Sequence, residues 1–187
     1  MSNEAGSVTT EAMTRAFKAL VTHVVIGVIV IGAILFVCQG RVAVNPRLLA
    51  DYPDAAPEVV LQFLYDARYR LILWACQALS ISWLTASWFL YHAQAARARD
   101  PETEGASRTP AWAALLFVTI IACSLAGWWL VWWPDYSANL APDRLLVSIA
   151  FVGIGTILAF WLATGLAVAR VMRRSVPGSG VLPDLWS

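Results

Sequence analysis

The chain has 187 residues, of which 59% are hydrophobic and 13% charged, and its formal net charge is +1. Soluble domains are about 45–50% apolar and about 25% charged, so this composition excludes an ordinary water-soluble globular protein. The nearly balanced charge gives no indication of a nucleic acid or of any other strongly charged partner.

Four long apolar segments organise the sequence. Each has about 20 residues or more, and at 1.5 Å per residue a helix of that length crosses the roughly 30 Å hydrocarbon core of a bilayer. Because lipid offers the backbone no hydrogen-bond partners, each segment is expected to be helical. The segments cover residues 19–38, 71–91, 111–133 and 145–169. The sequence therefore predicts an all-α polytopic membrane protein, a single transmembrane domain of four helices arranged as two hairpins.

The first segment is predicted to be a retained helix that follows an N-terminal tail, residues 1–18. Its apolar run is longer than the usual 7–15 residues of a signal peptide, and Val37-Cys38-Gln39-Gly40 is a poor cleavage site.

The outer connection, residues 39–70, is too long for a simple turn. Within it Pro57 and Glu58 are typical of a helix start, and apolar residues then recur at helical spacing up to Leu64. We expect residues 56–70 to form an amphipathic extension that either continues into the second helix or lies on the membrane surface.

Tryptophans are concentrated where the third segment ends, in the stretch GWWLVWW before Pro134. Indole rings favour the headgroup layer, so these residues are predicted to form a membrane-interface belt. A sharper interpretation is that they also form an apolar rim for a lipid, a quinone or a partner helix. The four residues are Trp128, Trp129, Trp132 and Trp133.

Basic residues set the expected orientation. They cluster in the N-terminal tail, in the connection of residues 92–110 and in the C-terminal tail of residues 170–187, whereas the third connection holds Arg144 alone. The positive-inside rule places both termini and the connection 92–110 in the cytoplasm, as in a multi-pass protein of the bacterial inner membrane. The C-terminal tail, rich in Gly, Pro and Ser, is predicted to be flexible.

Small residues at a spacing of four form smooth faces on two of the helices, and such faces allow close helix packing in lipid. These faces either pack against neighbouring helices within the bundle, or at least one of them seats a helix of another membrane subunit. They comprise Gly155, Ala159, Ala163 and Ala167 in the fourth helix and Ala78, Ser82 and Ala86 in the second.

Groups suited to chemistry are scarce. The four apolar cores contain no Asp, Glu, Lys or Arg, and no nucleophile or phosphate-binding motif and no metal-ligand spacing occurs. The three cysteines, Cys38, Cys76 and Cys123, are far apart in the sequence and are expected to pack as small apolar side chains. His23 and His92 should lie toward the same leaflet, where they either ligate a b-type haem or a quinone headgroup or serve as interfacial residues without a ligand.

The sequence thus predicts no enzyme, no metal and no obligatory cofactor. The hypothesis it favours is a non-catalytic integral membrane subunit, an anchor or scaffold of a larger inner-membrane assembly in contact with other membrane subunits and the lipid bilayer. The alternatives are a haem- or quinone-associated redox subunit that uses His23 and His92, and a small oligomeric channel or transporter.

Overall fold

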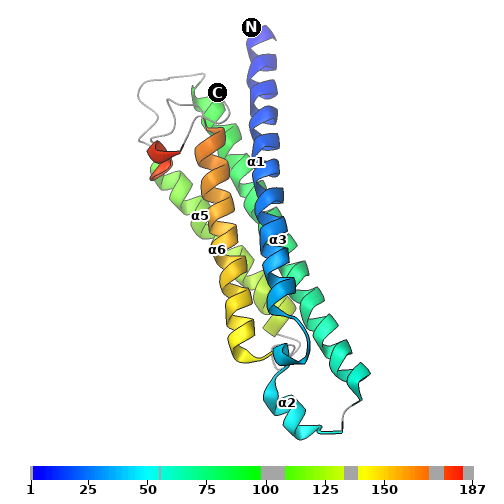
Figure 1. Ribbon diagram of the computed structural model, residues 1–187. Helices are drawn as coiled ribbons and strands as arrows, with labels where there is room; N and C mark the ends of the chain where they lie inside the picture. Colours follow the sequence, from blue (N-terminus) through cyan, green and yellow to red (C-terminus); the bar gives the residue numbers. More distant parts are fainter. Residues whose placement is uncertain (1, 55, 98–107, 133–138, 169–174, 183–187) are drawn as a thin grey trace. The chain divides into compact units, whose positions relative to one another are not determined.

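The structure, a computed structural model, describes residues 2–54, 56–97, 108–132, 139–168 and 175–182 (Figure 1). Helices account for 89% of these residues, and no strand occurs among them. The principal helices are α1 (Ser2–Val37), α2 (Pro46–Asp51), α3 (Pro57–Arg97), α5 (Thr109–Gly127) and α6 (Pro142–Ala167). A π-helical turn, Trp128–Trp132, follows α5, and 3₁₀ turns occur at Arg41–Ala43 and Ser179–Val181.

Four of the helices are long and apolar enough to cross a membrane, which confirms the prediction of a helical chain with four candidate spans. The spans within the described residues are Gly6–Val37, Pro57–Ala95, Thr109–Trp132 and Pro142–Ala167.

Two of these helices are longer than their apolar cores. In α1 the tail expected at residues 1–18 is helical from Ser2, and Thr10 and Thr14 do not interrupt it because their hydroxyls donate to carbonyls four residues earlier. In α3 the amphipathic extension continues directly into the second apolar segment. A stripe of buried residues at helical spacing explains this continuity, since it gives the extension a packed face: Val60, Leu64, Ala67 and Leu71.

The contacts divide the chain into two compact units, to which α1, α3, α5 and α6 all contribute. The first unit comprises Met1–Val25, Leu79–Ile120 and Thr156–Ser187, and the second comprises Ile26–Ala78 and Ile121–Gly155. The core of the first unit is built around Phe160 and Trp112, whose rings lie 5.6 Å apart, together with small residues from three helices. In the second unit Trp74, Ile34 and Val152 are among the buried residues.

All seven small residues of the predicted smooth faces are buried inside the chain. Ala86, Ala163 and Ala167 belong to the core cluster of the first unit, which also contains Ala19 of α1. In the second unit a Cβ at Gly155 would come within 2.5 Å of Cγ2 of Val30, so α6 and α1 are in close contact there. A helix of another subunit would therefore have to pack on a different face.

Two connections meet in the second unit. Val44, just before α2, forms an isolated antiparallel bridge with Leu140, just before α6, and both side chains are buried. The bridge is held by hydrogen bonds from Ala141 N–H to Ala43 O (3.0 Å) and from Asn45 N–H to Asn139 O (3.3 Å). The first and third connections therefore share one end of the helices.

Part of the C-terminal tail folds back on α6. Ser175, Val176 and Ser179 are buried, and the indole N–H of Trp161 donates to Pro177 O at 2.7 Å. Gly178 adopts φ +73°, a left-handed conformation that suits glycine, beside the Trp161 ring. Residues 175–182 of the tail, which its Gly, Pro and Ser content predicted to be flexible, pack against α6; residues 170–174 and 183–187 lie outside the described residues.

Candidate functional site

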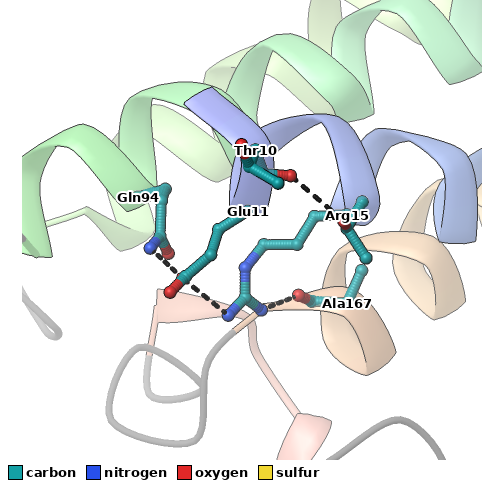
Figure 2. A network of polar contacts seen from close by, with 6 residues as sticks. Thr10, Glu11, Arg15, Gln94 and Ala167 are labelled. Atoms are coloured by element: carbon teal, nitrogen blue, oxygen red, sulfur yellow. Dashed lines mark hydrogen bonds and ion pairs between the residues drawn. The ribbon is translucent and has the colours of Figure 1, made fainter. Parts of the chain in front are cut away.

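Two places in the chain bring together groups that could bind or react: a set of polar side chains inside the first unit and an apolar pocket in the second. In the first unit, Arg15 of α1 occupies the C-terminal end of α6, where one of its guanidinium nitrogens donates to Ala167 O (Figure 2). The last carbonyls of a helix have no partner within it and carry partial negative charge, so a cation here satisfies an acceptor and complements the helix dipole.

Glu11 and Gln94 complete this polar network. Glu11 pairs with Arg15 across one helical turn at 3.7 Å, and its carboxylate accepts a hydrogen bond from the Gln94 amide of α3 (Figure 2). Gln94 is buried, whereas about half of the Glu11 side chain is exposed. The network thus ties α1 to α3 and α6, and each of its groups serves helix packing.

His23 lies deeper in the first unit and is only 3% exposed. Its Nδ1 is 2.7 Å from Ala19 O, and its Nε2 is 2.8 Å from the Ser82 hydroxyl of α3. Because a carbonyl oxygen only accepts, Nδ1 carries the proton of a neutral ring and Nε2 accepts from Ser82. Ser82 Oγ also lies 3.4 Å from Thr156 O of α6. Axial ligation of a haem by His23 would require breaking one of these contacts.

His92 has different surroundings. It is exposed, and its ring packs against the rings of Trp88 and Tyr91, with centroids 4.1 and 5.5 Å away. The structure therefore places one histidine in the interior and the other at the surface of the unit. The binding of haem or quinone by these two residues stays a prediction.

Two polar side chains of α5, Thr119 and Trp112, form further hydrogen bonds to neighbouring helices in the first unit. Thr119 and Thr85 lie 2.7 Å apart, and the indole N–H of Trp112 donates to the Thr164 hydroxyl at 2.9 Å. Since Thr119 and Thr164 also donate to carbonyls one turn earlier, these buried hydroxyls are matched by partners within the chain.

The tryptophan stretch begins at a close backbone contact in the second unit. A Cβ at Gly127 would come within 2.6 Å of the Trp74 ring, whose N–H donates to Cys123 O at 2.8 Å. The helix then widens into the π-helical turn, where Arg70 donates to Leu130 O at 3.2 Å. Within the turn Val131 is buried; the exposed residues are Trp128, Trp129 and Trp132, and Trp133 lies outside the described residues.

Two of the three cysteines are buried, as expected of small apolar packers, and the third is not. Cys38 and Cys123 are buried and Cys76 is exposed, and none forms a disulfide. The described residues bring no three of His, Cys, Asp and Glu together in a metal-binding arrangement.

The apolar pocket lies in the second unit between α2 and the first turns of α3. Its volume is about 470 Å³, within the range of about 300–1,000 Å³ that is usual for small-molecule sites. The lining residues are Leu48, Leu49, Tyr52, Val59, Val60 and Phe63.

The sequence pattern predicted the apolar spacing of the α3 residues that line the pocket, but it did not predict the helix α2. The signal for α2 was Asn45-Pro46, an N-cap whose side chain accepts from Arg47 N–H, followed by proline at the first helical position.

In comparisons with known proteins, no family model, no curated protein and no solved structure matches the chain.

Proposed function

We propose that the protein is a non-catalytic integral membrane subunit that anchors or scaffolds a larger assembly in a bacterial inner membrane. The observation that carries the proposal is the engagement of two polar side chains that could otherwise serve chemistry. Arg15 donates to Ala167 O of α6, and His23 lies between Ala19 O of its own helix and the Ser82 hydroxyl of α3. Their role in this arrangement is to hold the helices together.

The outer face of α1 supports the same proposal. Large apolar side chains project from it over several turns, a surface suited to lipid or to the helix of another subunit. They include Val24, Val25, Val28, Ile29 and Phe36, all more than half exposed. Since the small-residue faces are buried within the chain, this band is where we place a partner subunit.

The proposed topology has both termini and the connection 92–110 in the cytoplasm, with the four spans forming two hairpins. The excess of arginine and lysine in those segments supports this orientation. The bridge between Val44 and Leu140 supports the arrangement as two hairpins, because four crossings require the first and third connections to share one side of the membrane.

Purification of the complex through this chain in a mild detergent, at native expression and followed by mass spectrometry, tests the function. We expect several membrane proteins in a fixed ratio, and we expect Val28→Trp on the outer face of α1 to weaken their retention. Leu84→Trp, at a similarly exposed position of α3, is the matched control. A monodisperse single chain after gentle extraction would overturn the proposal.

Labelling of single cysteines with a membrane-impermeant maleimide tests the orientation independently. In a background with the three native cysteines replaced by alanine, Val42→Cys, at a position 77% exposed before α2, should react in cells whose inner membrane is intact. Gly6→Cys, in open space near the N-terminus, should react only after permeabilisation of that membrane. The opposite pattern would reverse the orientation.

A further inference from the structure

The pocket between α2 and α3 is lined almost entirely by hydrocarbon. Five of its six lining residues are leucine, valine or phenylalanine, and the phenol of Tyr52 supplies the only polar side-chain group. Water in such a pocket would find almost no hydrogen-bond partners, so an apolar occupant is favoured. An extended peptide is disfavoured for the same reason, because its backbone N–H and C=O groups would be left unsatisfied there.

The position of the pocket in the chain brings it close to lipid. α2 lies beyond the end of α1, where the apolar run stops at Val37, and beside the start of α3, which leads into the second apolar segment (Figure 1). A short helix with leucines on one face and charged residues around them is suited to the boundary between headgroups and acyl chains. Tyr52, which is 64% exposed, is of the type that is enriched at that boundary.

The charges around the pocket indicate which headgroup would fit. In the described part of the segment from Asn45 to Glu58, three carboxylates and one guanidinium are exposed: Asp51, Asp54, Glu58 and Arg47. A net negative surface repels anionic headgroups and attracts a cationic amine, whereas the single arginine can pair with a phosphate.

We propose that this pocket binds one hydrocarbon chain of a zwitterionic, amine-bearing phospholipid. The chain fills the space between Leu49, Phe63 and Val59, and the amine lies among the carboxylates outside. Occupancy would brace α2 against α3 and so stabilise the outer connection. The inference is independent of the proposed subunit role, since a lone protein could bind the same lipid.

Native mass spectrometry of the full chain, released from nanodiscs of phosphatidylethanolamine and phosphatidylglycerol in equal amounts, tests this proposal. Wild type should retain one phosphatidylethanolamine in preference to phosphatidylglycerol. Val59→Trp, which places an indole in the pocket, should reduce that retention about tenfold. Leu61→Trp is the matched control, because Leu61 lies on the same helix with a similar exposure (42% against 43%) but outside the pocket lining.

Equal retention by wild type and Val59→Trp would overturn the site, and a preference for phosphatidylglycerol would overturn the headgroup assignment. A second measurement on the unaltered protein avoids dependence on the folding of a variant. Phosphatidylethanolamine with a photoactivatable group in its acyl chain should cross-link within residues 48–63 when it is added to the protein in nanodiscs. Cross-links spread evenly over the exposed faces of the four long helices, without enrichment in that segment, would also overturn the proposal.

Discussion

At Gly127 the backbone of α5 lies against the Trp74 indole of α3, and a Cβ there would come within 2.6 Å of the ring. Any side chain at this position must displace a ring that is buried and anchored by its hydrogen bond to Cys123 O. This arrangement gives the glycine a steric role that can be measured.

We therefore expect Gly127→Ala to lower the free energy of unfolding by about 1–3 kcal/mol, the usual cost of overpacking a well-packed site. Titration of the detergent-solubilised protein with a denaturing detergent measures this value. Gly153→Ala is the control, since a Cβ there meets nothing within 4 Å and the alanine improves helix propensity. Equal effects of the two substitutions would contradict the close contact.

Ser82 is the second residue whose role can be measured. In Ser82→Ala the Nε2 atom of His23 loses its donor in the interior of the first unit. Because interhelical hydrogen bonds in membrane proteins contribute about 1 kcal/mol, we expect a loss of that size in the same unfolding titration. Ser80→Ala, at an exposed position of α3, should have little effect. If Ser82→Ala left the free energy of unfolding unchanged, His23 would have another hydrogen-bond partner in the variant.

At the scale of whole helices, the hydrogen bond from Arg15 to the end of α6 should contribute to stability separately from the ion pair between Arg15 and Glu11. Arg15→Ala removes both the pair with Glu11 and the hydrogen bond to Ala167 O, whereas Glu11→Gln removes the pair but keeps an oxygen acceptor for Gln94. Exposed ion pairs contribute about 0–1 kcal/mol. We expect Glu11→Gln to cost less than about 0.5 kcal/mol and Arg15→Ala about 1–2 kcal/mol in free energy of unfolding. Similar losses would indicate that the contact with α6 contributes nothing.

The C-terminal segment of residues 175–182 is attached to α6 by apolar packing and by one hydrogen bond from the Trp161 indole. Trp161→Phe keeps a six-membered aromatic ring but removes the five-membered part of the indole, with the N–H that donates to Pro177 O. We expect amide hydrogen exchange in this segment to become about fivefold faster, as the loss of about 1 kcal/mol predicts. Trp88→Phe, at an exposed tryptophan of α3, is the control. Unchanged exchange in Trp161→Phe would show that apolar contacts alone hold the segment.

The sequence was sufficient to predict the four apolar helices, because hydropathy over about 20 residues depends on the bilayer and not on the details of packing. Contacts between distant residues could not be predicted in the same way. Arg15 was interpreted as a topology signal, and its position against Ala167 depends on how α1 and α6 pack. Glu11 and Arg15 are four residues apart, a spacing that brings side chains together on a helix, whereas Gln94 is distant in sequence and has no such local signal. Similarly, the pocket requires α2, a helix too short for hydropathy to reveal.

For the molecule as a whole, the bridge between the first and third connections provides a test of the arrangement. In a background without the native cysteines, Val44→Cys with Leu140→Cys should form a disulfide readily. The two residues form a non-hydrogen-bonded antiparallel pair, whose Cα atoms lie about 4.5 Å apart, within the roughly 4.4–6.8 Å range of disulfides. Disulfide formation is measured by the mobility of the chain on a non-reducing gel after protease cleavage between the two positions. The control pair, Val42→Cys with Leu140→Cys, should form a disulfide far more slowly. Absence of the first cross-link would contradict the bridge.

The hydrogen bond from Arg15 to Ala167 O also sets an order of events during synthesis. Its two residues are 152 positions apart, and a ribosome adding about 5–20 residues per second needs roughly 8–30 s to make the intervening chain. During that interval Arg15 lacks its acceptor at the end of α6, whereas α3 is made earlier and contacts α1 through Ser82 and Trp83. A nascent chain stalled before α6 should therefore expose Arg15 to chaperones, insertion factors and quality-control proteases, and this vulnerability should end when the last helix enters.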